Sequence, residues 1–327
     1  MGETSELTAG AAEEAGALAR AVLAEVQKVV LGQETVLEGM IVALLAGGHA
    51  LLEGVPGTAK TLAIRALAQA VDASFARVQF TPDLMPTDIT GVSMLNSLER
   101  RFDFHKGPIF ADLVLADEIN RAPAKTQAAL LEAMQERQVT IDGVTHPLPD
   151  GFTVFASENP VEHEGTYPLP EAELDRFLLN IRVGYPDEAA EIGILDRHAE
   201  GFEASNPASF GIRQVLSREG LRSLRKAARR VRVEPALRAY VVAIVRRTRE
   251  EPSLVLGASP RASVALFQSA QARALIQGRD YVIPDDVKEL APAVLRHRVV
   301  LTAEAEVEGG TPEARIESVL RAVEAPR

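Results

Sequence analysis

The chain has 327 residues, of which 46% are hydrophobic and 25% charged, and its net charge is -11. These values are typical of a globular protein with a sizeable core and about two domains, and the lack of cysteine excludes disulfides and thiolate metal sites. The first sixteen residues lack the basic start and apolar run of a signal peptide, and the longest apolar stretch, Met40 to Leu52, is too short to span a bilayer. We therefore expect a soluble, cytoplasmic protein without a membrane span.

Two helices are predicted before the first strand. Residues 1–17 are rich in alanine and glutamate, and we expect them to be disordered. From residue 18, apolar residues recur at three- and four-residue spacing as far as Gly32, a helix stop. A second helix is predicted from Gln33 to Ala46, because two glycines follow it directly.

The loop GVPGTAKT, Gly54 to Thr61, follows a short apolar run of the buried-strand type and precedes a helical pattern. It differs in one letter from the phosphate-binding pattern G-x-x-x-x-G-K-[ST], because Ala59 stands where the pattern has glycine. In this context its backbone N–H groups would surround phosphates, Lys60 would neutralise their charge, and the Thr61 hydroxyl would bind Mg²⁺. The alternative is a Gly/Pro turn before an ordinary helix.

Ala59 would directly precede the lysine at the helix entrance. A methyl group is no obstacle there if the backbone is already right-handed helical. We therefore expect a negative φ at Ala59, and a positive φ would mean that the loop is built differently.

Strands and helices alternate through the first half of the chain. After the loop come predicted strands at Phe75–Phe80, Leu113–Ala116, Phe152–Ala156 and Leu178–Val183, with a helix at Lys125–Glu136. Such alternation indicates an α/β fold, a parallel sheet with helices on both faces. From Asp187 onward only helical patterns occur, so we expect an αβα core over residues 18–186 and a separate, all-helical domain over residues 187–327. The predicted helices there cover residues 187–198, 217–230, 234–250, 259–277 and 284–296.

An acidic pair ends one of the apolar strands, in the segment LVLADEINRAP. In a nucleotide site, Asp117 would hold Mg²⁺ through water and Glu118 would polarise the water that attacks the γ-phosphate. A solvated strand end is the alternative, and the combination with the phosphate loop favours the nucleotide site. Because no N-K-x-D stretch that could read guanine occurs, the expected nucleotide is ATP.

Two longer stretches carry a family resemblance. The segments VLADEINRAPAKTQAALLEAMQE and ENPVEHEGTYPLPEAELDRFLL make the chain resemble an AAA+ ATPase, and more narrowly the MoxR family of the helix-2-insert branch. The similarity extends from about residue 18 to residue 302. It implies a P-loop NTPase core of three αβα layers, followed by a small helical lid.

The resemblance also implies residue roles. Asn159 matches the sensor that positions the attacking water, Arg176 the arginine finger offered to a neighbouring subunit, and Arg261 the lid arginine that senses the γ-phosphate. Glu158 is a departure, because relatives more often carry glutamine there, and a carboxylate near the triphosphate should weaken it slightly or be neutralised by a partner. The segment Val29–Glu34 corresponds to the part beside the adenine. The expected nucleotide-binding residues are Val30, Leu31, Gly32, Gly54, Val55, Pro56, Gly57, Thr58, Ala59, Lys60, Thr61 and Leu62.

Assembly and partners follow from the same resemblance. It implies a homo-oligomeric ring, expected to be a hexamer, that does chaperone-like work on a protein client, often with a von Willebrand factor A domain protein as adaptor. The insertion at Thr81–Pro108 and a hairpin around Asp142-Gly143 would face the pore. Residues 1–188 contain 13 Lys+Arg against 28 Asp+Glu, whereas residues 189–327 contain 22 against 18. This asymmetry fits head-to-tail packing of subunits, although helix faces that merely differ in charge would give it too.

Other interpretations of these residues stay open. Arg176 could form an intrachain ion pair with Asp175 or Glu173, and Arg261 could be a surface residue at a helix start. The basic stretch Leu221–Val233 lacks interleaved aromatic residues in an acidic chain, so nucleic acid is not the expected partner. The alternative functions are a nucleic-acid-associated AAA+ motor and a nucleotide-switched scaffold that does not hydrolyse ATP.

Overall fold

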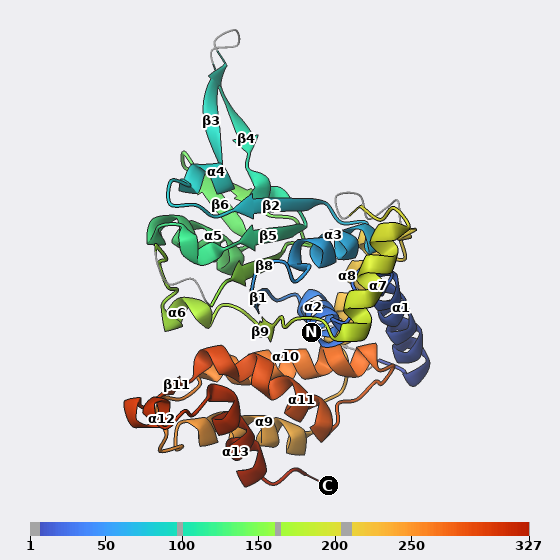
Figure 1. The fold of residues 1–327 in the computed structure, drawn as a ribbon, viewed down its shortest axis with the longest axis vertical. Helices are drawn as coiled ribbons and strands as arrows, with labels where there is room; N and C mark the ends of the chain where they lie inside the picture. The colour runs from blue at the N-terminus through green and yellow to red at the C-terminus, as the bar shows by residue number, and fades with distance from the viewer. Residues whose placement is uncertain (1–6, 97–100, 161–164, 204–210, 327) are drawn as a thin grey trace, which may run out of the picture.

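A five-stranded parallel sheet forms the centre of the protein (Figure 1). The computed structural model describes residues 7–96, 101–160, 165–203 and 211–326. The strand order confirms the expected parallel sheet, because every neighbouring pair in it runs parallel. From one edge to the other, the strands are β2 (Phe75–Gln79), β5 (Leu113–Asp117), β8 (Thr153–Glu158), β1 (Ala50–Glu53) and β9 (Leu179–Arg182).

Two hydrophobic cores cover the two faces of this sheet. Alternate residues of one strand belong to different cores: Leu113 and Leu115 of β5 pack into the larger core, whereas Val114 and Ala116 pack into the smaller one. Side chains of a strand point to opposite faces with a period of two, so both faces must be apolar when both are covered. This explains why the inner strands β1 and β5 occur in the sequence as continuous apolar runs.

Helices supply the other side of each core, which confirms the αβα arrangement. The larger core contains residues of α1 (Ala9–Gln27), α2 (Glu34–Ala46), α3 (Lys60–Ala70) and α8 (Arg218–Ala228). The smaller core contains residues of α4 (Pro86–Thr90) and α5 (Ala124–Glu136). Within the described ranges, none of the helices has the length and apolarity needed to cross a bilayer. Short single-turn elements connect these parts: η1 (Pro108–Phe110), η2 (Ile119–Arg121) and α6 (Glu171–Leu174).

The C-terminal helices pack beneath the sheet layer (Figure 1). After α7 (Glu188–Ala199) and α8, this group comprises α9 (Pro235–Thr248), α10 (Pro260–Ile276), α11 (Pro284–Leu295), η4 (Arg296–Arg298), α12 (Ala303–Val307) and α13 (Pro312–Ala322). The expectation that this half contains no strands is wrong, because β10 (Leu254–Leu256) pairs antiparallel with β11 (Val300–Leu301). Strands of two or three residues are too short to show a period. The domain division between residues 186 and 187 stays a prediction.

Two hairpins project from the core. In the expected insertion, β3 (Gly91–Asn96) pairs with β4 (Arg101–Lys106) in a long arm that extends away from the sheet, while residues 97–100 lie outside the described part (Figure 1). The second hairpin, β6 (Gln138–Ile141) and β7 (Val144–Pro147), confirms the predicted turn. Asp142 and Gly143 at its tip both have left-handed backbone angles, with φ of 49° and 78°. Such angles are typical of two-residue hairpin turns.

The N-terminal segment departs from expectation. Disorder was expected for residues 1–17, but α1 begins at Ala9, with the Thr8 side chain accepting from the Ala11 backbone N–H at 3.4 Å. The expectation is therefore wrong for residues 9–17, while residues 1–6 lie outside the described ranges. The alanines of this segment are strong helix formers, and Ala12, Ala15 and Ala19 are buried. Their small side chains let α1 approach its neighbours closely.

We predict that Gly16→Ala lowers the midpoint of thermal unfolding. A Cβ atom at Gly16 in α1 would lie 2.5 Å from the Leu275 carbonyl oxygen of α10 and 2.7 Å from Gly278. Overpacking of this kind typically costs about 1–3 kcal/mol. Gly10→Ala is the matched control, because a Cβ there would meet nothing within 4 Å, and it should be neutral or slightly stabilising. Equal midpoints for both variants would contradict the docking of α1 on α10.

Candidate functional site

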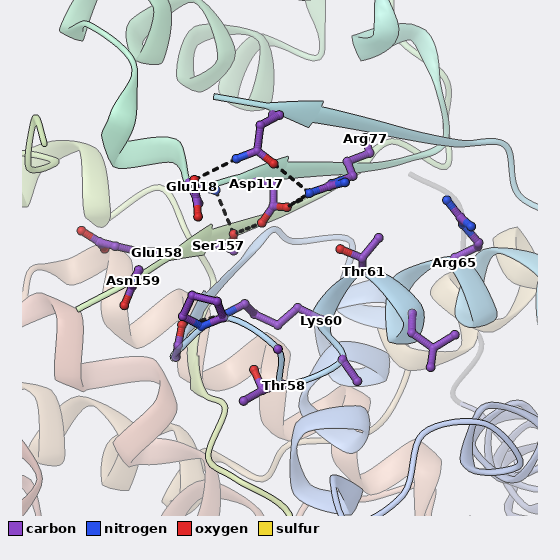
Figure 2. A pocket seen from close by; sticks show the side chains of 16 residues that line it. Thr58, Lys60, Thr61, Arg65, Arg77, Asp117, Glu118, Ser157, Glu158 and Asn159 are labelled. Carbon is purple, nitrogen blue, oxygen red and sulfur yellow. Dashed lines mark hydrogen bonds and ion pairs between the residues drawn. The ribbon is translucent and has the colours of Figure 1, made fainter. Parts of the chain in front are cut away.

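A cavity of about 580 Å³ opens at the carboxyl ends of β1, β5 and β8 (Figure 2). The loop after β1 forms one side of it, and the ends of β5 and β8 form the other. Most of the predicted site residues meet here: Gly54, Pro56, Gly57, Thr58, Ala59, Lys60, Thr61, Leu62, Asp117, Glu118 and Asn159. Val55 was also predicted, but it does not line this cavity. Its carbonyl oxygen accepts a hydrogen bond from Thr58 Oγ1 at 3.0 Å.

Lys60 folds back onto its own loop. Its Nζ donates to the Gly54 carbonyl oxygen at 2.5 Å and to the Val55 carbonyl oxygen at 3.0 Å. Burial lowers the pKa of this ammonium, while Asp117 and Glu118 act in the opposite direction. A phosphate anion in the cavity would offer the lysine a partner of opposite charge in place of neutral carbonyl groups.

Ala59 has φ 61° and ψ 18°, a left-handed conformation, so the expectation of a negative φ is wrong. The expectation assumed that the helix already includes this residue. In the structure α3 begins one residue later, at Lys60, and Ala59 is its N-cap. The loop is therefore built differently at this position: the backbone needs the conformation that glycine adopts without strain. Lys60 and Thr61 line the cavity in spite of the change.

The two predicted carboxylates have several partners. Asp117 Oδ2 accepts from Arg77 Nε at 3.0 Å and from another guanidinium nitrogen of Arg77 at 2.6 Å, while its Oδ1 accepts from Ser157 Oγ at 2.5 Å. Glu118 Oε2 accepts from Gln79 Nε2 at 2.9 Å. Glu118 itself has a positive φ of 56°, in the turn that ends β5.

Four cavity residues were not predicted from the sequence: Arg65, Arg77, Gln79 and Ser157. Arg77 and Gln79 have i and i+2 positions on β2, so both point to the same face of the sheet. An arginine and a glutamine in a strand carry no motif of their own. The alternation of polar residues at the end of β2 is the one signal that could have indicated them.

Glu158 and Asn159 follow each other at the end of β8 and line the cavity. Glu158 is the register partner of Glu53 on the neighbouring strand β1. Burial, and then the charge of Glu53, raises the pKa of Glu158 above its ordinary value. The carboxyl group is therefore more readily protonated than an exposed one.

A second cavity, of about 600 Å³, adjoins the first and shares Gly57, Thr58, Ala59 and Leu62 with it. Val30 and Leu31, which were predicted to lie beside the base, line this cavity. Gly32, also predicted, does not line this cavity. It has a φ of +66°, and a Cβ atom at this position would lie 2.6 Å from the Cβ of Ala190 and 3.1 Å from that of Pro186. The apolar wall of this cavity includes Ile194 and Leu195 of α7, and Phe202. The sequence did not predict this wall, because a helical pattern does not indicate which cavity the helix will cover.

Arg176 and Arg261 lie outside both cavities. Arg176 forms the ion pair that was the alternative interpretation, with its Nε 2.7 Å from Glu173 Oε2, and it also donates to Gln135 Oε1. Arg261 is exposed in the first turn of α10, where its backbone N–H donates to Ser259 Oγ at 3.1 Å. Thus neither arginine completes the site of its own chain in this structure.

We predict that Ala59→Gly raises the midpoint of thermal unfolding. The left-handed conformation costs an alanine roughly 1–2 kcal/mol, of which glycine's greater freedom in the unfolded chain offsets about 0.5–1 kcal/mol. Ala63→Gly in the interior of α3 is the control and should lower the midpoint. A loss of similar size in both variants would show that Ala59 is not strained.

We predict that Glu158→Gln changes the pH dependence of nucleotide affinity. As pH rises through its raised pKa, Glu158 loses its proton and places a negative charge on the cavity wall, so ATP should bind more weakly. The expected effect is roughly fivefold, on the order of 1 kcal/mol, in titrations between about pH 5 and pH 8. Glu132→Gln, on the exposed side of α5, should retain the pH dependence of the unaltered protein. An identical pH profile in Glu158→Gln would contradict the assignment.

Comparisons with known proteins agree with this geometry. A family model described as "ATPase family associated with various cellular activities (AAA)" matches residues 49–179, and one described as "AAA lid domain" matches residues 246–319. The chain is 48% identical to Chaperone MoxR1 of Mycobacterium tuberculosis over 327 aligned residues, which cover 97% of this chain and 85% of that protein. It is also 48% identical to protein YeaC of Bacillus subtilis, an uncharacterized protein, with 92% of each chain covered.

A solved structure shares the whole fold. The crystal structure of a protein from Cytophaga hutchinsonii superposes with a TM-score of 0.89 at 40% sequence identity, covering 97% of both chains. The sheet order, the two adjoining cavities and the full-length similarity to a MoxR protein agree with each other. The chain belongs to the MoxR family of AAA+ ATPases.

Proposed function

We propose that this protein hydrolyses ATP with Mg²⁺, at the interfaces of a ring of identical subunits. The observation that carries the proposal is the pair of adjoining cavities, one polar and lined by the Lys60 loop and two carboxylates, the other partly apolar. A triphosphate and an adenosine need these two environments side by side. The loop Gly57–Ala59 forms the shared wall between them.

The cavity residues fit a magnesium-bound triphosphate. Thr61 and Asp117 both line the cavity and offer oxygen donors, which Mg²⁺ prefers. In the described ranges no group of three His, Cys, Asp or Glu residues could hold a metal, so the remaining ligands would be phosphate oxygens and water. Bound Mg²⁺ would neutralise phosphate charge. Among the described residues, Arg77 bonds only Oδ2 of Asp117, and Oδ1 accepts from Ser157 alone, so Oδ1 could also accept from a water on the Mg²⁺.

The remaining cavity residues have roles in the attack of water. Glu118 would accept the proton of the attacking water, and Asn159 would orient that water from the adjacent strand. Lys60 would leave its carbonyl partners for the phosphates. Together these residues provide charge and orientation within one subunit.

The positions of Arg176 and Arg261, which line neither cavity of their own chain, support catalysis at a subunit interface. Asp175, next to Arg176, accepts from Ser259 Oγ at 2.9 Å, and Ser259 is the N-cap of the helix that carries Arg261. The two arginines therefore belong to one surface region, away from the chain's own cavity. We propose that this region is offered to the neighbouring subunit, where arginine is typically worth about 10³–10⁵ in rate.

The work done by the ring is proposed to be chaperone-like remodelling of a protein client. One relative is named as a chaperone, and the arm formed by β3 and β4 exposes Met94 and Phe102 to solvent at 55% and 71%. Exposed apolar side chains on a projecting hairpin are suited to contact another protein. A hexameric ring, a von Willebrand factor A domain adaptor and a cytoplasmic location belong to the same proposal.

We predict that Glu118→Gln binds ATP normally but hydrolyses it about 10²-fold more slowly or worse, because a positioned general base contributes about 10²–10⁴ in rate. Phosphate release measures the turnover, and a fluorescent ATP analogue measures the affinity. The same variant should accumulate the ATP-bound ring, from which a client can be recovered and identified by mass spectrometry.

Glu132→Gln serves as the control for this experiment as well, because its carboxylate lies on the exposed side of α5, away from the cavity. It should hydrolyse ATP at the unaltered rate. Brisk hydrolysis by Glu118→Gln would remove the proposed base. Absence of turnover in the unaltered protein at every concentration would favour the nucleotide-switched scaffold instead.

A further inference from the structure

A buried arginine of the C-terminal helices reaches the segment that carries Arg176. Arg298 lies in η4, and its side chain is only 3% exposed. Each of its five N–H donors is matched by an acceptor: Asp175 Oδ1 at 2.7 Å, and the carbonyl oxygens of Asp175 at 3.3 Å, Phe177 at 2.5 Å, Leu178 at 3.2 Å, and Val294. A guanidinium group has these five donors in a fixed, planar arrangement.

Four of the five acceptors belong to the residues on either side of Arg176. Asp175 precedes it, and Phe177 and Leu178 follow it. His297, the residue before Arg298, adds a contact of 3.1 Å between its Nε2 and the Phe177 carbonyl oxygen. The backbone on both sides of Arg176 is therefore fixed to η4, whereas the Arg176 side chain pairs with Glu173 and donates to Gln135 Oε1 and to the Leu131 carbonyl oxygen.

We propose that Arg298 is a positioning residue that fixes Arg176 for use in the neighbouring subunit's site. This inference rests on the proposed function, in which Arg176 completes a neighbouring site. Arg298 touches no part of either cavity in its own chain. Loss of Arg298 should therefore leave nucleotide binding intact and impair hydrolysis in the neighbouring subunit's site.

The size of the effect follows from geometry. A catalytic group misplaced by about 1 Å can lose about 10²-fold in rate. Without the five-donor contact, the Asp175–Leu178 segment keeps its contacts with Ser259 and His297 and its strand and turn contacts. We expect kcat to fall by about 10- to 100-fold in Arg298→Met, with the nucleotide Kd unchanged within about twofold.

Mixed rings distinguish a positioning role from general damage. A Lys60→Ala subunit should lack nucleotide binding but present an intact Arg176, whereas an Arg298→Met subunit should bind nucleotide but present a misplaced Arg176. Each variant alone should be nearly inactive. On mixing, phosphate release should recover, because an Arg298→Met site next to a Lys60→Ala subunit has every group it needs. No recovery would mean that Arg298 acts in its own chain's site or only supports folding, and would overturn the inference.

Arg176→Ala mixed with Lys60→Ala tests the underlying function separately. If that pair recovers and the Arg298→Met pair does not, the inference fails while interface catalysis stands. If the Arg176→Ala pair does not recover, or Arg176→Ala alone turns over normally, the proposed function fails.

A milder variant covers the case in which Arg298→Met does not fold. Asp175→Asn keeps the shape and the Oδ1 acceptor but removes the charge that faces Arg298 and Ser259. It should lower kcat severalfold with an unchanged Kd and should also be rescued by Lys60→Ala. An unchanged kcat in Asp175→Asn, with its thermal midpoint preserved, would overturn the inference.

Discussion

The order of the strands is the constraint on which the site depends. Because β1 lies between β8 and β9, and β8 lies between β1 and β5, the ends of three strands that are far apart in the sequence meet at one edge. The loop after β1 therefore faces the residues that end β5 and β8. Parallel sheets place ligands at this edge, outside the carboxyl ends of the strands. Every role proposed for a cavity residue assumes this meeting.

Lys60, Asp117 and Glu118 in the cavity all have hydrogen-bond partners within the chain in this structure. Lys60 donates to carbonyl groups of its own loop, and Asp117 accepts from Arg77 and Ser157. Buried charges are costly without such partners. Nucleotide binding would therefore be an exchange of partners, in which phosphate replaces carbonyl groups at Lys60. Contacts that must break before others form reduce net affinity, so the binding energy depends on differences between them.

Local patterns were sufficient for the sheet, most helices and the phosphate loop, since each rests on a period or on a motif of adjacent residues. Features created by distant contacts were not predictable in this way. The left-handed Ala59 depends on where α3 begins, and the pairing of Arg77 with Asp117 depends on two strands becoming neighbours. The start of α1 at Ala9 depends on alanines buried against other helices, which composition alone assigned to disorder. Arg298 lies just beyond the helix predicted at residues 284–296, and that helical pattern does not indicate which segment Arg298 contacts.

Functions that depend on a second subunit are harder to predict from the sequence than nucleotide binding. The cavity residues of the core converge within one chain, whereas the catalytic roles proposed for Arg176 and Arg261 would require a second subunit. In a single chain Arg176 pairs with Glu173 and Arg261 is exposed. An isolated subunit would show these positions whether or not the two arginines act in a neighbouring site. Assembly is therefore the step that connects the fold to the proposed activity, and the contacts of Arg298 connect the C-terminal helices to that step.

In the proposed function, a triphosphate with Mg²⁺ binds against the loop after β1, with Lys60 as its counter-charge. Calorimetric titration of ATP with Mg²⁺ into the unaltered protein, Lys60→Ala and Lys226→Ala tests it directly; Lys226 is an exposed lysine on α8. Saturable binding that is lost in Lys60→Ala and retained in Lys226→Ala is the predicted result. Absence of binding in the unaltered protein, or equal binding by Lys60→Ala, would contradict the account.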